Sequence, residues 1–394
     1  MVKKTINLFL FLTFVKNFGF SAHFAVYVIF LTSKGLNLFE VNLVNLVFFM
    51  TIFIFEIPTG AVADVFGRKI SYVISCFLFA VGMFIYGVSN SFLGFALAEA
   101  VAAVAATFSS GAFQAWLVDK LEHHGYSDSL VPVFKKEQWV QRISGVLGAL
   151  IGSVMANKNL AFPWFFGGVI ILLGGITAAI SMKEEYFTRK KYSFFSGIRS
   201  MKETAVKSFH YSLKNQNFQF LLIMGFVCMF SVQALNMQWQ PFFARFFPSK
   251  THLGVLWGVM AGFILAGNQA SSWLSERVSN KRLALIFSQI AVGAGIVFSA
   301  ISGILPITLS FFMLHEFARG MYTPLQDAYL NNNIPSSERA TLISFNSMSS
   351  HIGGAIGLVM SGFIAQHFSI PTAWLFSGTI LLFVCFYLWR KNRG

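Results

Sequence analysis

Long apolar runs alternate with short polar loops along this chain of 394 residues. A helix that crosses a membrane needs roughly 20 mostly apolar residues, and twelve runs reach that length. The pattern therefore predicts an all-α membrane protein with twelve membrane-spanning helices. The expected spans are residues 6–31, 41–63, 70–88, 91–118, 138–156, 162–182, 219–243, 253–274, 283–302, 305–331, 340–366 and 371–389.

Composition supports the same class. Only 11% of the residues are charged and 56% are hydrophobic, whereas soluble domains average about 25% charged residues. A net charge of +14 would suggest nucleic-acid binding in a soluble protein, but here the basic residues lie mainly in short loops. We therefore expect contacts with membrane lipids and no nucleic-acid partner.

The basic residues also predict the orientation of the chain. Loops on the side of the N-terminus hold 22 of the 29 lysines and arginines, and the opposite loops hold only four. Cytoplasmic loops of membrane proteins carry an excess of these residues. We expect a multi-pass protein of the cytoplasmic (inner) membrane, with both termini in the cytoplasm.

The longest polar segment, residues 183–217, divides the spans into six and six. It predicts an N-terminal six-helix bundle over 1–182, a cytoplasmic linker over 183–217 and a C-terminal six-helix bundle over 218–394. Apolar residues recur every three or four positions in the linker, which predicts an amphipathic helix on the inner leaflet; a protein-docking segment is the alternative. These residues are Ile198, Met201, Ala205, Phe209 and Leu213.

A charged loop after the second span has a copy in the second half of the chain. The first copy is Gly60-x-x-x-Asp64-x-x-Gly67-Arg68-Lys69, and the copy after span eight is Ser272-x-x-x-Glu276-x-x-Ser279-Asn280-Lys281. Residues 110–119 in span four and 323–332 in span ten are similar in the same way. Two related six-span halves are typical of transporters whose halves rock against each other.

These features resemble the major facilitator superfamily over essentially the whole chain, through the twelve spans, the basic central loop and the signature that begins at Gly60. Residues 56–60 and 110–119 are most similar to bacterial members that export drugs or metabolites. Two features depart from the pattern. Val65 stands where many members carry arginine, and the glycine run 145–152 of span five lacks the proline of the antiporter motif.

The resemblance implies that the signature loop is a latch between the two halves. In the family the aspartate matching Asp64 faces the N-terminal end of span eleven, where the helix dipole favours a carboxylate. Arg68 then has a candidate partner in Asp119, and Gly60 and Gly67 are expected to allow close backbone approach and positive φ. Such a latch would favour the outward-open state, and a stop-transfer charge cluster is the alternative. The expected gating residues are Gly60, Asp64, Gly67, Arg68, Lys69, Asp119 and Glu276.

Ionisable residues inside spans are costly and usually face a cavity. Lys16 lies near the middle of span one, and His23 follows seven residues later, on the same face of a continuous helix. Amides around Trp239 in span seven suit a solute that forms hydrogen bonds. The candidate substrate-binding residues are Lys16, His23, Gln233, Asn236, Trp239, Arg319 and His351.

Each candidate has a structural alternative. Glu316 and Arg319 are three residues apart and would pair on one helix. His23 and His351 would be hydrogen-bonded packing residues, and the amides would link helices. Lys16 is the hardest to explain in this way, because a lysine at this depth needs a carboxylate partner, a water-filled cavity or an anionic ligand.

The energy source is expected to be an ion gradient, because the chain contains no Gly-x-x-x-x-Gly-Lys-Ser/Thr nucleotide loop. Burial disfavours the charged form of a carboxylate, so Glu99 and Glu316, with the adjacent His315, are the candidates for proton coupling. The cysteines lie singly in apolar runs, so we expect no disulfide, metal site or cofactor. They are Cys76, Cys228 and Cys385.

These observations leave three functions. The preferred hypothesis is a monomeric, proton-coupled carrier that exports a small amphiphilic solute or metabolite by alternating access. The alternative is a carrier of organic anions, including siderophore-like carboxylates, in either direction. A membrane enzyme or receptor is the third, but the sequence contains no Ser/His/Asp set or metal cluster that indicates catalysis, so we expect no enzyme.

Overall fold

The computed structural model describes residues 1–185, 215–278, 280–334 and 339–391. Nearly all of these residues are helical, and the described part of the chain contains no β-strand. The predicted all-α class is therefore confirmed. Most of the predicted linker and its amphipathic helix lie outside the described residues, so the division at 183–217 stays a prediction.

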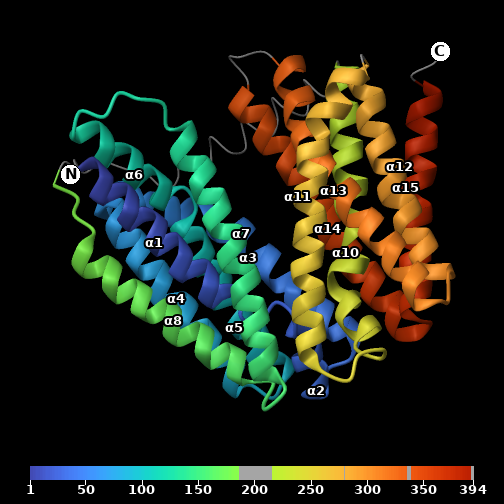
Figure 1. Cartoon of the computed structure of the whole chain (residues 1–394), viewed down its shortest axis with the longest axis horizontal. Helices are drawn as coiled ribbons and strands as arrows, with labels where there is room; N and C mark the ends of the chain where they lie inside the picture. The colour runs from blue at the N-terminus through green and yellow to red at the C-terminus, as the bar shows by residue number, and fades with distance from the viewer. Residues whose placement is uncertain (186–214, 279, 335–338, 392–394) are drawn as a thin grey trace. The chain divides into compact units, whose positions relative to one another are not determined.

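The first half of the chain forms helices that closely follow the predicted spans (Figure 1). Two of them, α7 and α8, begin with a proline in the first turn, where the missing N–H costs nothing. The helices are α1 (Val2–Ser21), α2 (Tyr27–Ser33), α3 (Leu38–Phe66), α4 (Arg68–Val88), α5 (Phe92–Ser109), α6 (Ala112–His123), α7 (Val131–Ala156) and α8 (Phe162–Ser181).

The second half continues with helices of 21 to 29 residues. Asparagine side chains cap the first turns of α10 and α12, as is common at helix N-termini. The helices are α10 (Gln216–Phe243), α11 (Lys250–Arg277), α12 (Lys281–Ile301), α13 (Leu305–Asn333), α14 (Arg339–His367) and α15 (Ile370–Lys391).

Ten helical segments of the described residues are long and apolar enough to cross a membrane. Two more predicted spans fall below that level of apolarity. The first consists of α1 and α2 and contains three lysines, and the second is α13, which contains His315, Glu316 and Arg319. With these two the helices account for the twelve predicted spans.

Two spans are broken where the sequence predicted continuous helices. Span one stops at Ser21 and resumes at Tyr27, because the N–H groups of Ala22, Phe24 and Val26 bond three residues back instead of four. Span four breaks between α5 and α6, where Gly111 has a φ of 68°. Both breaks occur in the first half of the chain.

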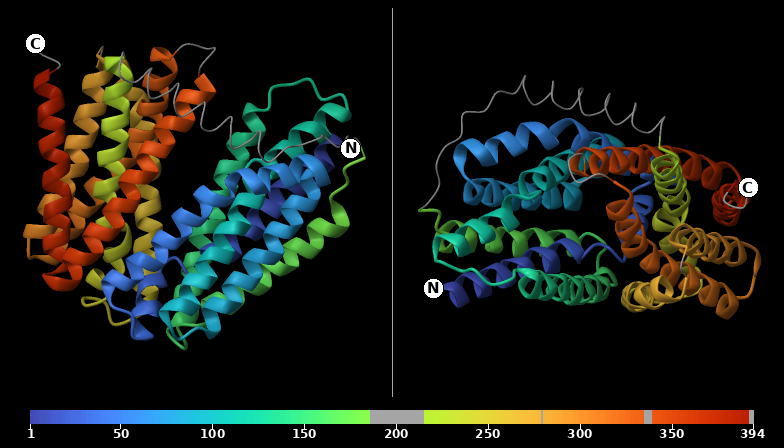
Figure 2. Two further views of the ribbon diagram at one scale, coloured as in Figure 1. Left: turned by 180° about the vertical axis from the view of Figure 1, so that it is seen from behind. Right: turned by 90° about the horizontal axis from the view of Figure 1, so that it is seen from above.

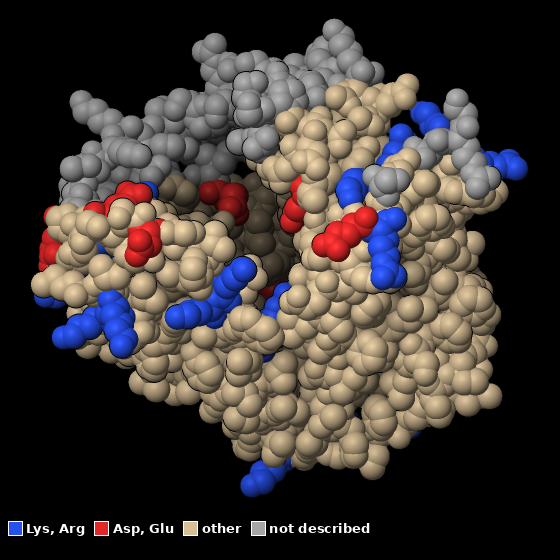
Figure 3. Space-filling view, turned by 45° about the horizontal axis from the view of Figure 1, so that its top comes forward, with Lys and Arg blue, Asp and Glu red and all other residues tan. Residues whose placement is uncertain are grey.

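The chain forms two compact units. As far as the structure describes these ranges, unit 1 contains Met1–Leu36, Val44–Ile198 and Phe247–Gly258, and unit 2 contains Asn37–Leu43, Arg199–Phe246 and Val259–Gly394. On the face seen in Figure 3, charged side chains gather at one end of each unit, whereas the sides carry few. Such a distribution suits helices whose sides contact lipid.

Glycines let the first and fifth spans of each half approach closely. In unit 1, α7 lies beside α1 (Figure 2), and a Cβ at Gly148 or Gly152 would overlap the carbonyl oxygen of Phe18 or Ala22. In unit 2, Gly353 and Gly357 of α14 meet the backbone of α10 in the same way. Small residues at helix interfaces are the usual means of close packing in membranes. The two halves of the chain therefore share this glycine-mediated contact between their first and fifth spans, as well as the repeated signature loop.

Candidate functional site

The signature loop turns at Gly67, the residue before α4. Its φ of 105° favours glycine, and a Cβ there would lie 2.6 Å from Glu184 Oε2. The Glu184 carboxylate accepts hydrogen bonds from the backbone N–H groups of Arg68 (2.9 Å) and Lys69 (3.1 Å). A carboxylate at this end of a helix is stabilised by about 0.3–1 kcal/mol. Glu184 therefore caps α4.

Arg68 connects the loop to α6. Its guanidinium forms an ion pair with Asp119, the partner expected from the sequence, and donates a hydrogen bond to the carbonyl oxygen of Ala115 (2.6 Å). Trp116 Nε1 donates to the carbonyl oxygen of Lys183 (3.2 Å). These contacts hold the start of α4, α6 and the residues after α8 together within unit 1.

A second ion pair fixes the same segment after α8. Lys120 Nζ lies 3.2 Å from Glu185 Oε2. This hydrogen bond and the lysine charge lower the pKa of the Glu185 carboxyl. Because Glu185 is exposed, the pair contributes little stability by itself, but it adds to the contacts of Glu184 next to it.

Other expectations for the loop are wrong or stay predictions. Gly60 lies inside α3, has no positive φ, and has no described atom within 4 Å of a Cβ placed on it. The expected close approach at Gly60 is therefore wrong, because α3 continues to Phe66 and Gly67 makes the turn. The Asp64 side chain and residues 335–338 before α14 lie outside the described residues, so the implied contact of Asp64 stays a prediction. Glu276 is exposed near the end of α11.

Replacing Gly67 with alanine should lower the thermal midpoint of the purified protein. A non-glycine residue at such a φ costs about 1–3 kcal/mol, and the new Cβ would displace the Glu184 carboxylate. Gly111→Ala is the matched control, because Gly111 also has positive φ but no described atom near its Cβ position. Equal losses in the two variants would show that the Glu184 cap adds nothing.

A buried carboxyl group lies between α2, α4 and α5. Glu99 is 6% exposed, and its Oε1 accepts a hydrogen bond from the Tyr27 hydroxyl at 2.8 Å. The Tyr27 hydroxyl also lies 3.4 Å from that of Tyr86. No described lysine or arginine forms an ion pair with Glu99. The break in span one places Tyr27 in the first turn of α2, close to this carboxyl group.

An aromatic stack adjoins the carboxyl group. Trp164 stacks on Tyr86 on one side (centroids 4.0 Å apart) and on His23 on the other (3.9 Å). His23 Nδ1 and Trp164 Nε1 are buried, and each lacks a hydrogen-bond partner among the described residues. The expectation that His23 shares a helical face with Lys16 is wrong, because α1 ends at Ser21 and His23 lies in the turn.

Lys16 is half-buried in α1 and forms no ion pair with a described carboxylate. Its Nζ lies 5.5 Å from the ring centroid of Tyr72 and 5.2 Å from that of Phe79. Cation–π contacts of this kind are attractive but do not neutralise the charge. No described carboxylate therefore lies in position to neutralise a charge on Lys16.

In unit 2, the amides of α10 meet the charged residues of α13. Arg319 donates to Asn236 Oδ1 (2.8 Å), and Asn236 Nδ2 donates to Gln233 Oε1 (3.3 Å). Glu316 Oε2 lies 3.6 Å from the Arg319 guanidinium, and His315 Nδ1 lies 3.8 Å from Glu316 Oε1. Glu316 and His315 are buried, whereas about a third of the Arg319 side chain (35%) is exposed. The predicted pair on one helix is thus present, and Arg319 also reaches α10.

The two remaining substrate candidates lie in different surroundings within unit 2. Trp239 is 2% exposed in α10, so its ring offers little surface to a solute. His351 is exposed in α14. A role in substrate binding stays a prediction for both.

The sequence matches the family model described as Major Facilitator Superfamily over residues 9–268 and 221–394. The chain belongs to the major facilitator superfamily. Members of this superfamily carry small solutes across membranes, so this protein is a multi-pass membrane protein of a transporter family. The resemblance inferred from the signature loop is confirmed.

Known superfamily members are similar to this chain over most of their length. The uncharacterized MFS-type transporter YxaM of Bacillus subtilis (strain 168) is 21% identical over 360 residues, which cover 91% of this chain and 88% of YxaM. Multidrug resistance protein 2 of the same organism is 20% identical over 336 residues, 82% of this chain and 79% of that protein. A crystal structure of the nucleoside transporter NupG has a TM-score of 0.80 at 14% identity, covers 99% of each chain and shows the shared fold.

Two carboxylates that form several hydrogen bonds in the folded chain, Glu184 and Glu137, were not predicted as site residues from the sequence. Glu184 follows span six directly, and no pattern signals its return to α4. Glu137 is 4% exposed in α7 and accepts hydrogen bonds from the side-chain amides of Gln114 and Gln141. The sequence analysis began span five at residue 138, although Pro132 signals an earlier helix start.

Proposed function

We propose that this protein is a proton-coupled secondary carrier that exports a small amphiphilic solute or metabolite. The proposal is carried by the buried pair of Glu99 and Tyr27. The carboxyl group accepts hydrogen bonds from neutral groups, among them the Tyr27 hydroxyl, and has no described cation to neutralise it. Burying a charge without such a partner is costly, so binding and release of a proton at Glu99 would change the energy of unit 1. That property is what proton coupling requires.

Export is proposed from two observations. One relative carries the name Multidrug resistance protein 2. In addition, the two segments that resemble exporters touch each other, because Ser110 Oγ donates a hydrogen bond to Glu56 Oε1 at 2.8 Å. The signature loop is proposed as the gating element, supported by the Arg68–Asp119 pair and the Glu184 cap.

Transport into liposomes tests this function. Purified protein is reconstituted, the interior is made acidic, and uptake of a panel of fluorescent amphiphiles is followed. An exporter that exchanges solute for protons should accumulate at least one of them against its gradient, and a protonophore should abolish the accumulation. Accumulation that persists after the pH gradient is collapsed would contradict proton coupling.

Lys16 favours a second candidate function, transport of organic anions. Its charge is not neutralised by a described carboxylate, and the rings of Tyr72 and Phe79 flank it. An ammonium group between aromatic rings suits a solute with a carboxylate and an apolar body.

Replacing Lys16 with alanine should separate the two candidates. Loss of a hydrogen bond to a charged group costs about 1.5–3 kcal/mol, so the apparent affinity for an organic anion should fall by about tenfold or more. Transport of lipophilic cations should be little changed. Lys34→Ala is the control, because Lys34 also lies over a phenylalanine ring but bonds to Asn90 in an exposed position. Equal anion transport by both variants would rule out Lys16 as the anion site.

A further inference from the structure

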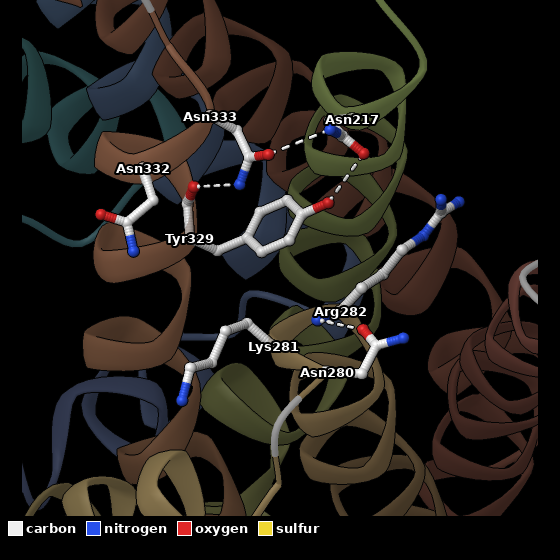
Figure 4. Close-up of a pocket in the computed structure, with 7 residues that line it drawn as sticks. All are labelled: Asn217, Asn280, Lys281, Arg282, Tyr329, Asn332 and Asn333. Carbon is white, nitrogen blue, oxygen red and sulfur yellow. Dashed lines mark hydrogen bonds between the residues drawn. The ribbon is translucent and has the colours of Figure 1, made fainter.

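A polar pocket lies at one end of unit 2, where α10 and α12 begin and α13 ends (Figure 4). Its volume is about 320 Å³. None of the residues that line it is acidic, and two are basic. The lining residues are Asn217, Asn280, Lys281, Arg282, Tyr329, Asn332 and Asn333.

One wall of the pocket presents mainly hydrogen-bond donors. Tyr329 donates from its hydroxyl to Asn217 Oδ1 (3.0 Å), Asn217 Nδ2 donates to Asn333 Oδ1 (2.9 Å), and Asn333 Nδ2 donates to the carbonyl oxygen of Tyr329 (2.8 Å). Within this series of hydrogen bonds, the amide oxygens of Asn217 and Asn333 each accept one bond. Because an amide nitrogen carries two hydrogens, Asn217 and Asn333 each keep one N–H for a ligand.

The opposite wall carries two positive charges. The Lys281 and Arg282 side chains extend in opposite directions from the start of α12 (Figure 4). Lys281 Nζ bonds to the carbonyl oxygen and hydroxyl of Ser275, and the Arg282 guanidinium lies over the Phe220 ring at 4.5 Å. Neither side chain forms an ion pair with a described carboxylate, and Arg282 Nε is buried without a hydrogen-bond partner among the described residues.

The internal repeat shows what this end of unit 2 lacks. In unit 1 the matching helix, α4, begins with Arg68, and the Glu184 carboxylate after the sixth span bonds to its first N–H groups. In unit 2 the neutral amide of Asn280 takes that role for α12, bonding to the N–H groups of Arg282 and Leu283. Among the described residues, the start of α12 thus carries two cations, Lys281 and Arg282, and is capped by a neutral amide instead of a carboxylate.

We propose that this pocket binds a phosphate-bearing anion, the chemistry shared by a phospholipid headgroup and a soluble phosphate. Arginine and lysine both bind phosphate oxygens, and the free amide N–H groups supply further donors. The pocket lies between the ends of membrane-spanning helices and is lined by two basic residues, and basic pockets between membrane helices bind anionic headgroups. None of the candidate residues for solute binding or proton coupling lines this pocket.

Thermal unfolding of the purified full-length protein in detergent tests the site. The midpoint is measured with inorganic phosphate, with phosphatidylglycerol in mixed micelles and with neutral phosphatidylcholine. A ligand that binds only the folded state raises the midpoint by an amount that grows with the logarithm of its concentration above Kd. We expect a rise with phosphatidylglycerol or phosphate beyond that with phosphatidylcholine. A rise with phosphatidylglycerol alone identifies a lipid headgroup, and a rise with both identifies any accessible phosphate.

Variants connect the rise to the pocket. Lys281→Gln with Arg282→Gln should raise the ligand concentration needed for a given rise in the midpoint by about tenfold or more. The control Lys135→Gln with Lys136→Gln removes two adjacent exposed cations from unit 1 and should leave it unchanged. If the double variant does not fold, Lys281→Gln alone should show a smaller shift in the same direction. No rise in the wild type, or a rise that the variants leave undiminished, overturns the proposal.

Discussion

Glu99→Gln should abolish accumulation driven by a pH gradient and leave the protein folded. Glutamine keeps the size of the side chain and an oxygen that accepts the Tyr27 hydrogen bond, but it does not bind and release a proton. Coupling free energies of about 1–3 kcal/mol correspond to factors of roughly 5–150, so uphill accumulation should fall by at least about tenfold. Exchange of labelled for unlabelled solute without a gradient should continue, because it needs no net proton movement.

Two further variants make this result specific. Tyr27→Phe removes the hydrogen bond but keeps the carboxyl group, and it should shift the pH dependence of transport without abolishing it. Glu122→Gln removes an exposed carboxylate of α6 and should change neither measurement. Wild-type accumulation by the Glu99→Gln variant would exclude Glu99 as the proton carrier and leave Glu316 as the candidate to test.

Gly152→Val should prevent stable packing of α7 on α1. The added side chain would overlap the backbone of Ala22, and backbone does not move aside as a flexible side chain does. Overpacking costs about 1–3 kcal/mol in cores where side chains adjust, and more is expected here. The yield of monodisperse protein and its thermal midpoint should both fall sharply.

Gly262→Val is the matched control for this packing prediction. Gly262 also lies within a membrane-spanning helix, but no described atom lies within 4 Å of its Cβ position. Gly357→Val should behave like Gly152→Val, because Gly357 meets the backbone of Phe230 in α10. If Gly152→Val and Gly262→Val have the same midpoint, close packing of these helices does not determine the stability of unit 1.

The fold was largely predictable because hydrophobic runs set the positions of spans in a membrane. The break between Ser21 and Tyr27 was not predictable in this way, since no proline lies in the turn and its only signal is a change in backbone hydrogen bonding. The break at Gly111 had a visible glycine, but a single glycine within an apolar run is ambiguous.

Only part of the candidate site was predictable from the sequence as well. Arg68 and Asp119 were paired from the family pattern, which encodes a contact between distant positions. No sequence pattern marks Glu184 as the cap of α4, because that contact depends on where α8 ends in the folded unit. Lys16 and Glu99 were visible as charges in apolar runs, whereas the tyrosines and rings that surround them come from other helices and appear only in the folded chain.

The cap on α4 has a consequence for biosynthesis. Glu184 is synthesised 116 residues after Arg68, whose N–H group it holds. While the ribosome is still producing the intervening helices, the start of the third span lacks that partner and the signature loop is incomplete. Nascent chains that stop before residue 184 should therefore expose this loop to proteases that the full-length protein resists.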